Sequence, residues 1–180
     1  MIEHLIELTK YLLPAIVVLV ATVMIVNNFL IKETERKRLA IFEKNSDTAM
    51  RLRLQAYERL AILVERMHPR SLVGRFYYKE ATAQDLQIEM VNAIRSEFEH
   101  NLSQQLYVSH EVWQTIRSVM EQEIMMINRV GASCELGTPA SEFVKRLTDF
   151  VLTSESAMPT DIALEIINKE AKATLFPPTT

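Results

Sequence analysis

The sequence has few of the residues that interrupt or cross-link a fold. It contains three glycines, six prolines and a single cysteine in 180 residues. The scarcity of glycine and proline disfavours an all-β fold, whose turns depend on them. The lone Cys134 excludes an internal disulfide and fits a reducing compartment. Three glycines also cannot build a nucleotide-binding loop, and neither G-x-x-x-x-G-K nor G-x-G-x-x-G occurs.

Charged residues are absent from one stretch, Tyr11–Ile31. A helix over these 21 residues spans about 30 Å, the thickness of a hydrocarbon core. Pro14 lies near the start of the stretch, where its missing N–H does little harm. The alternative is a buried core helix, but a domain of this size has no interior that would surround one. We therefore predict one transmembrane helix over residues 11–31.

The residues before the stretch argue against a cleaved signal peptide. Residues 1–10 carry Glu3 and Glu7 against a single Lys10. A signal peptide has a basic start, a shorter apolar region and a small-x-small cleavage site, and none is evident here. The segment is therefore expected to remain as an anchor.

Basic residues gather just after the apolar stretch. They are Lys32, Arg36, Lys37, Arg38 and Lys44. The positive-inside rule then predicts a protein of the cytoplasmic membrane with residues 1–10 outside and a helical domain, 32–176, in the cytoplasm. Residues 177–180 form a tail. Asn27 and Asn28 are interpreted as interfacial, the alternative being hydrogen bonds between helices in a homo-oligomer.

Helical periodicity runs through residues 32–176 and predicts an all-α fold, a compact bundle of about four to five helices. The first helix either runs on or bends near Asn45–Asp47, and it ends at His68–Pro69. Its predicted buried stripe comprises Leu52, Ala56, Tyr57, Leu60, Leu63, Val64 and Met67. Residues 70–81 are predicted to be a connection.

Three further boundaries follow from capping patterns. Thr82 with Asp85 predicts a capping box, opening a helix through about Leu106 whose inner face includes Val91, Phe98 and Leu102. Ser109 caps the next helix, which Gly131 or Gly137 ends. Thr138–Pro139 opens a helix through about Thr153, with proline at the first helical position, and a last helix covers about residues 161–173.

Charge is divided unevenly along the chain. Residues 32–79 hold 12 basic and 6 acidic residues, whereas residues 80–180 hold 7 basic and 15 acidic ones. The basic half is expected near anionic headgroups of the lipid bilayer. The acidic half is a poor surface for nucleic acid, so no nucleic-acid partner is expected. A solvated surface is the simplest meaning of the acidic half, and a basic partner is the alternative.

Two E-x-x-H pairs, Glu65/His68 and Glu97/His100, have the spacing of di-iron carboxylate bundles. Helical geometry points His100 and Glu65 away from the core, so no metal ligands and no cofactor are predicted. Ser109 and His110 are neighbours on a helix start and face different ways. Cys134 is interpreted as a core residue at the end of its helix. No catalytic residues are predicted.

Two charged residues fall on apolar stripes. Glu123 lies at the centre of one stripe and Arg53 near the centre of another. Because a buried unpaired carboxylate is costly, the two are predicted to form an internal pair that fixes helix register. The alternative is that one of them reaches solvent at a groove or an oligomer interface.

Two segments carry a resemblance. LRLQAYERLAILVERMHP (residues 52–69) and AIRSEFEHNLSQQLYVS (residues 93–109) resemble a family of uncharacterised bacterial single-pass membrane proteins. The resemblance covers most of the chain and implies an N-terminal anchor with a helical cytoplasmic region. No activity is established for that family, so no site residues are carried over.

The sequence thus predicts a membrane-anchored, non-enzymatic interaction or scaffold protein whose bundle docks a protein partner or itself. Two alternatives stay open. One is a metal-binding bundle or enzyme that uses the E-x-x-H pairs, and the other is an accessory subunit of a larger membrane complex.

Overall fold

The computed structural model describes the backbone of residues 2–153 and 157–176, and the side chains from residue 16 onward within those ranges. These residues form six α-helices and one 3-10 helix, with a single isolated bridge between Thr82 and Pro139. The predicted all-α class is confirmed. The chain divides into two compact units, Met1–Ala49 and Met50–Thr180. The predicted tail, residues 177–180, lies outside the described residues.

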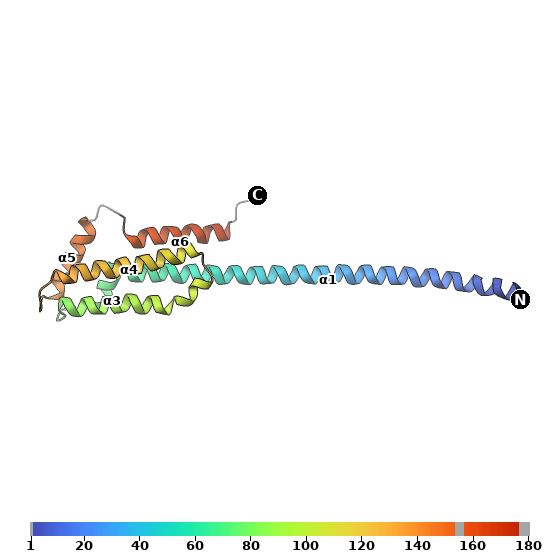
Figure 1. The fold of residues 1–180 in the computed structure, drawn as a ribbon, viewed down its shortest axis with the longest axis horizontal. Coiled ribbons are helices and arrows are strands. Elements are labelled where there is room, and N and C mark those ends of the chain that lie inside the picture. The colour runs from blue at the N-terminus through green and yellow to red at the C-terminus, as the bar shows by residue number, and fades with distance from the viewer. Residues whose placement is uncertain (1, 154–156, 177–180) are drawn as a thin grey trace. The chain divides into compact units, whose positions relative to one another are not determined.

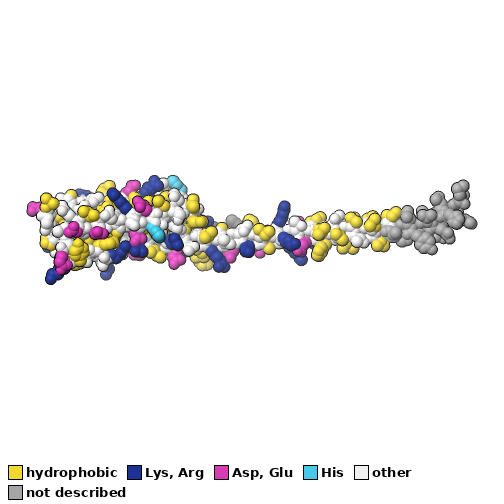
Figure 2. All heavy atoms as spheres, turned by 90° about the horizontal axis from the view of Figure 1, so that it is seen from below, with side chains coloured by type: hydrophobic (Ala, Val, Ile, Leu, Met, Phe, Trp, Pro, Cys, Tyr) yellow, Lys and Arg dark blue, Asp and Glu magenta, His cyan; other side chains and the backbone are white. Residues whose placement is uncertain are grey.

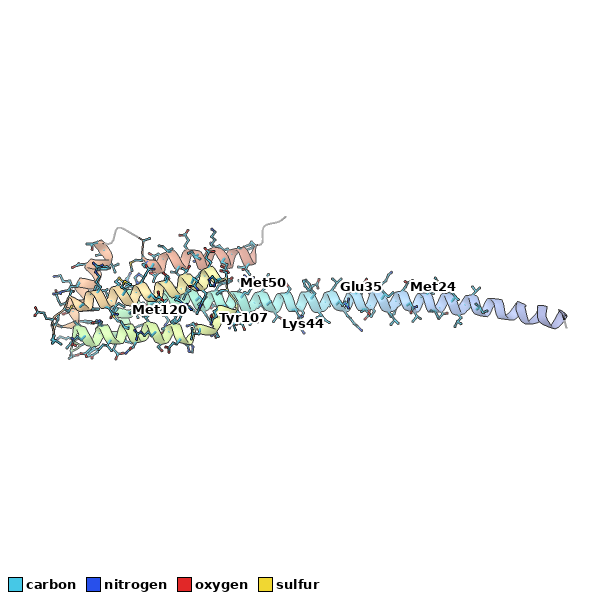
Figure 3. All side chains as sticks on the ribbon, in the orientation of Figure 1. Met24, Glu35, Lys44, Met50, Tyr107 and Met120 are labelled. Atoms are coloured by element: carbon cyan, nitrogen blue, oxygen red, sulfur yellow. The ribbon has the colours of Figure 1, made fainter. Side chains whose placement is uncertain are left out.

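Helix α1 (Ile2–Met67) provides all the secondary structure of the first unit and runs on through Asn45–Asp47 without a break. Every side chain from Ile16 to Ile31 is exposed, with Ile25 at 68%. Figure 2 shows the apolar side chains that follow the undescribed grey end of the chain, and in Figure 3 Met24 projects freely from the helix. Among the described residues, this is the one helix long and apolar enough to cross a membrane, with a mean hydropathy of 1.9 over its best window.

The second unit is a bundle built from the end of α1 and five complete helices (Figure 1). Helices α3 (Ala83–His100) and α4 (His110–Ala132) pack along each other. Helix α4 also contacts α5 (Ala140–Thr153) and α6 (Pro159–Leu175), and α3 contacts α2 (Pro69–Phe76). The largest fully buried side chains in this core are Phe143, Leu60, Leu63, Met67, Leu72, Leu86, Met90, Ile94, Ile116, Ile127, Leu147 and Ile167.

Two predicted helix starts are confirmed by their hydrogen bonds. The Asp85 backbone N–H donates to Thr82 Oγ1 at 3.2 Å, and the Thr82 N–H donates to Asp85 Oδ2 at 3.1 Å, which completes the capping box. The Val112 N–H donates to Ser109 Oγ at 3.2 Å. These side chains satisfy N–H groups that have no partner within their own helix.

The predicted connection at residues 70–81 is wrong over its first half, because Pro69–Phe76 is the helix α2. Pro69 is compatible with the first helical turn, and His68 Nδ1 accepts the Arg70 N–H at 3.1 Å. The burial of the Leu72 side chain stabilises this short helix against its loss of conformational entropy. Leu72 is a single apolar anchor without a repeating stripe, so periodicity does not reveal the helix. Helix α2 also raises the number of helices above the predicted range.

Several predicted boundaries and buried positions shift. Helix α3 ends at His100, and a separate 3-10 helix, η1 (Leu102–Leu106), follows it. Its start is marked by Asn101, whose side-chain Nδ2 donates to the Glu97 carbonyl at 2.8 Å. Leu52 and Leu102 are exposed by 40% and 41%, so both were wrongly placed on buried stripes, whereas the other six members of the α1 stripe are buried.

The end of α4 and the starts of α5 and α6 also differ from prediction. Gly131 lies inside α4, where its missing Cβ leaves room for the Gln87 side chain from α3. The left-handed residue is Gly137, with φ of 81°, in the turn beyond the helix. Helix α5 begins at Ala140, one residue later than predicted, and the Ala140 N–H donates to the Ala81 carbonyl in the segment that precedes α3. Helix α6 spans residues 159–175 rather than 161–173.

Candidate functional site

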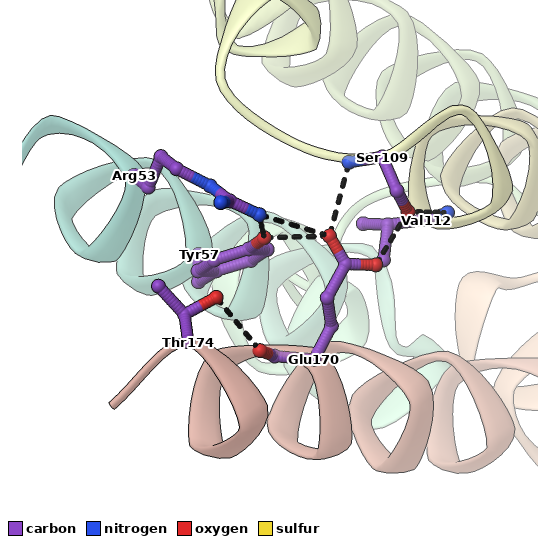
Figure 4. Close-up of polar contacts among 6 residues, drawn as sticks. All are labelled: Arg53, Tyr57, Ser109, Val112, Glu170 and Thr174. Atoms are coloured by element: carbon purple, nitrogen blue, oxygen red, sulfur yellow. Dashed lines mark hydrogen bonds and ion pairs between the residues drawn. The ribbon is translucent and has the colours of Figure 1, made fainter. Parts of the chain in front are cut away.

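A cluster of polar side chains joins three helices around Glu170 of α6 (Figure 4). The Tyr57 hydroxyl from α1 donates to Glu170 Oε1 at 2.5 Å. Ser109, the N-cap of α4, donates its backbone N–H to the same oxygen at 3.0 Å and its hydroxyl to the other carboxylate oxygen. The carboxylate therefore accepts hydrogen bonds from both neighbouring helices.

Arg53 completes this cluster from the exposed side of α1. Its Nη2 donates to the Tyr57 hydroxyl at 3.1 Å and lies 3.9 Å from Glu170 Oε1. Burial alone would raise the pKa of the Glu170 carboxyl, but the hydrogen bonds from Ser109 and Tyr57 and the charge of Arg53 outweigh it, so the pKa is lowered. Burial, and then the hydrogen bond to Glu170, raises the pKa of the Tyr57 phenol. The cluster therefore holds a charged carboxylate beside a neutral phenol.

The predicted Glu123–Arg53 pair is wrong. The Arg53 side chain is 46% exposed and engages Tyr57 and Glu170 instead. Glu123 is fully buried, and neither of its carboxylate oxygens has a hydrogen-bond partner. The buried positions of α1 begin at Ala56, and Arg53 lies before them among exposed residues. Glu170 is the partner that the sequence analysis missed, although its place three residues after the buried Ile167 put it on the inner face of α6.

Glu123 lies where α4 meets the beginning of α6. The negative charge of Asp161 on α6 acts on Glu123, and the hydroxyl of Thr160, next to Asp161, is buried without a partner. Burial first, and the negative charge of Asp161 second, raise the pKa of Glu123 to about 8. At neutral pH this carboxyl is therefore mostly protonated and uncharged.

The structure separates the members of the two E-x-x-H pairs. Glu97 Oε1 forms ion pairs with Arg66 Nη2 at 2.8 Å and Arg75 Nη2 at 3.1 Å, which neutralise its charge. His100 and Glu65 are exposed, as their helical positions predicted. His68 uses Nδ1 to cap α2. Within the described part of the chain, no group of three or more His, Cys, Asp or Glu residues is placed to hold a metal ion.

Neither candidate nucleophile has catalytic surroundings. The Ser109 hydroxyl donates to Glu170 and accepts from the Val112 N–H, which are the bonds of a structural N-cap. Cys134 follows the C-cap Ser133 and so lies just beyond α4, not within its end as predicted. Its thiol is partly buried against the core and lies 3.6 Å from the Val130 carbonyl.

Two hollows mark the surface near these groups. One, of about 270 Å³, lies among α4, the end of α5 and the start of α6, and Glu123, Arg129, Phe150, Met158 and Pro159 are among the residues that line it. The other, of about 360 Å³, is a mainly apolar groove between α2 and α5. Val73, Leu147 and Leu152 contribute to its walls.

Comparison with known proteins places the chain in a family without giving it an activity. No curated protein and no solved structure was found to match it. A family profile described as "Family of unknown function (DUF7935)" matches residues 3–174, nearly the whole chain. The match agrees with the uncharacterised family that the two sequence segments resemble. The chain therefore belongs to this family of unknown function.

Proposed function

We propose that this protein is a single-pass anchor of the bacterial cytoplasmic membrane that presents a helical bundle to the cytoplasm, where the bundle docks a protein partner. The observation that carries the proposal is the exposed apolar run Ile16–Ile31. Moving a large apolar side chain out of water is worth about 1.5–3 kcal/mol, and twelve of the sixteen residues in this run carry such a side chain without protein cover, so the run strongly favours lipid around it.

The charge flanking this run supports the proposed orientation. Lys32, Arg36, Lys37 and Arg38 follow within two helical turns, and Lys37 pairs with Glu33 at 3.4 Å on the helix surface. Each well-placed basic residue near anionic headgroups contributes about 1 kcal/mol. With the bundle on the same side as these residues, the positive-inside rule assigns it to the cytoplasm.

The chemistry of the bundle supports binding rather than turnover. Glu97, Glu170 and Ser109 are each engaged in bonds between helices, which leaves their reactive groups occupied. The pairing of Glu97 with two arginines also gives the metal-binding alternative no support. An accessory subunit of a larger membrane complex differs from the proposed role in that its partners would co-purify stably.

Cross-linking in living cells tests the docking role. The tagged full-length chain is cross-linked before lysis, and a tagged chain that ends at residue 49 serves as the matched control because it keeps the anchor and loses the bundle. The expected result is a discrete adduct with another protein that requires the bundle. A full-length chain that gives no adduct beyond those of the control would contradict docking, and an adduct with a second copy alone would assign the bundle to self-association.

A further inference from the structure

Glu123 is a fully buried acid on α4, the helix that packs against α6. Its side chain exposes none of its surface, and both oxygens lack hydrogen-bond donors. Burying a carboxylate without a partner is far more costly than burying the neutral acid. The contact between α4 and α6 is therefore more stable with Glu123 protonated than with Glu123 ionised.

The groups around Glu123 offer no compensation for a negative charge. From α6, Asp161 acts on it with the same sign of charge. From α4 itself, Arg129 lines the adjacent hollow, but its guanidinium lies 5.7 Å from the Phe150 ring centre and makes a cation–π contact there. Helix α5 contributes the apolar Phe150 and Val151 to that hollow. The buried residues of α1 and α3 are apolar except Tyr57, whose hydroxyl is committed to Glu170.

The two halves of helix α6 differ in the side-chain hydrogen bonds that hold them to the rest of the bundle. Its second half is tied to α1 and α4 through Glu170, with bonds from Tyr57 and Ser109. Its first half begins at Met158 without a side-chain cap and includes the unpartnered Thr160 hydroxyl. Met158 and Pro159 also line the hollow beside Glu123, so water has space to enter there when this half moves.

We propose that Glu123 is a proton switch: the neutral acid keeps the first half of α6 packed on α4, and loss of its proton releases that half while Glu170 retains the other. Release relieves the buried charge, because the carboxylate becomes hydrated and its distance from Asp161 can increase. The switch exposes the apolar inner face of the first half of α6, including Ala163. A rise in local pH removes the proton from Glu123 and so triggers the release.

The size of the effect follows from proton linkage. The pKa of Glu123 is about 8 in the packed state and close to the ordinary glutamate value of 4.5 when hydrated. The packed state therefore holds the proton more tightly, and packing weakens as pH rises from 4.5 to 8. Between about pH 6 and about pH 9, the opening equilibrium of the first half of α6 should increase about 100-fold.

Hydrogen–deuterium exchange of the full chain in detergent micelles tests the proposal. Exchange rates, corrected for intrinsic pH dependence, are compared at about pH 6 and about pH 9 for peptides covering α6. In the wild-type chain, the first half of α6 should lose about 100-fold in protection and the second half much less. Glu123→Gln, which has no proton to lose, should keep the same protection at both pH values.

The exposed Glu121→Gln, two residues away on α4, is the matched control and should behave as the wild type does. Should Glu123→Gln fail to fold, Glu123→Met provides a second neutral side chain of similar length. Infrared difference spectra of the wild type add an independent readout, since the carboxylic acid C=O band should disappear over the same pH range. Equal protection of α6 in the wild type at both pH values would overturn the proposal, as would an unchanged pH response in the neutral variants.

Discussion

Glu170 shows how one side chain can connect three helices that are distant in sequence. Tyr57 and Ser109 lie 113 and 61 residues away along the chain, yet both donate to its carboxylate. Hydrogen bonds to a charged acceptor are roughly twice as strong as neutral ones. Ser109 is the N-cap residue of α4, so its bonds to Glu170 also hold the start of α4 against α6.

Replacing Glu170 by Gln should destabilise the bundle. The amide cannot accept all the hydrogen bonds that the carboxylate receives, and the expected loss is about 1–3 kcal/mol in the free energy of unfolding at neutral pH. Because the folded pKa of Glu170 is lowered, its contribution is present above about pH 4.5 and is lost as pH falls through the folded value. Chemical denaturation over a range of pH measures the difference.

The exposed Glu165, on the same helix, provides the control for this substitution. Glu165→Gln should leave the free energy of unfolding within about 0.5 kcal/mol of the wild type. A Glu170→Gln chain as stable as the Glu165→Gln chain at neutral pH would show that the cluster contributes nothing.

At the scale of elements, local sequence rules placed helix starts better than helix ends. Thr82 and Ser109 were identifiable because a capping side chain acts within three residues, and the structure shows both hydrogen bonds. The end of α3 depends instead on Asn101, whose side chain folds back on the Glu97 carbonyl. Helix α2 depends on Leu72, which is fully buried in the core shared by the helices. The burial of this single residue leaves no periodic trace in the sequence.

Side-chain pairing was harder to predict than burial for a related reason. The inner position of Glu123 followed from helical spacing and is confirmed. Its partner did not follow, because Arg53 is exposed and lies beside Glu170 of α6 instead. A stripe tells which side of a helix is inside, but it does not tell which residue of another helix comes opposite.

The capping box at Thr82 makes a prediction for α3. Thr82→Ala removes the acceptor for the Asp85 N–H and should lower the free energy of unfolding by about 0.5–2 kcal/mol. The bridge to Pro139 and the Ala83 N–H bond to the Thr138 carbonyl lie beside it, so the start of α3 should also exchange faster. Thermal unfolding and hydrogen exchange measure the two effects.

Thr148→Ala is the control for the capping prediction, because Thr148 is exposed within α5 and its hydroxyl bonds only the Val144 carbonyl of its own helix. It should change stability by no more than about 0.5 kcal/mol. Equal effects of the two substitutions would argue against a capping role for Thr82.

In the molecule as a whole, the two units differ in whether their apolar side chains are covered by protein. The side chains of Ile16–Ile31 have no protein cover, whereas the second unit buries its own apolar residues in one core. The proposed function assigns lipid to the first unit and the cytoplasm to the second. In this proposal, the basic residues after the apolar run determine which end of the helix faces the cytoplasm.

A charge placed in the apolar run should therefore weaken its insertion. Val20 lies near the middle of residues 11–31, and Val20→Arg is expected to add about 3–4 kcal/mol to the apparent free energy of insertion. The fraction of the chain that resists alkaline extraction from membranes should fall accordingly. Val20→Leu, the matched apolar change, should leave that fraction unchanged; an equal fraction in both variants would contradict lipid burial of this segment.

The most direct measurement is the fate of the full-length chain after cell fractionation, with a compartment-sensitive reporter fused to its C-terminus. The anchored arrangement predicts that the chain sediments with membranes, resists extraction by salt and alkali, and gives reporter activity only for a cytoplasmic fusion. Recovery of the chain in the high-speed supernatant, or activity of a periplasmic reporter alone, would contradict it.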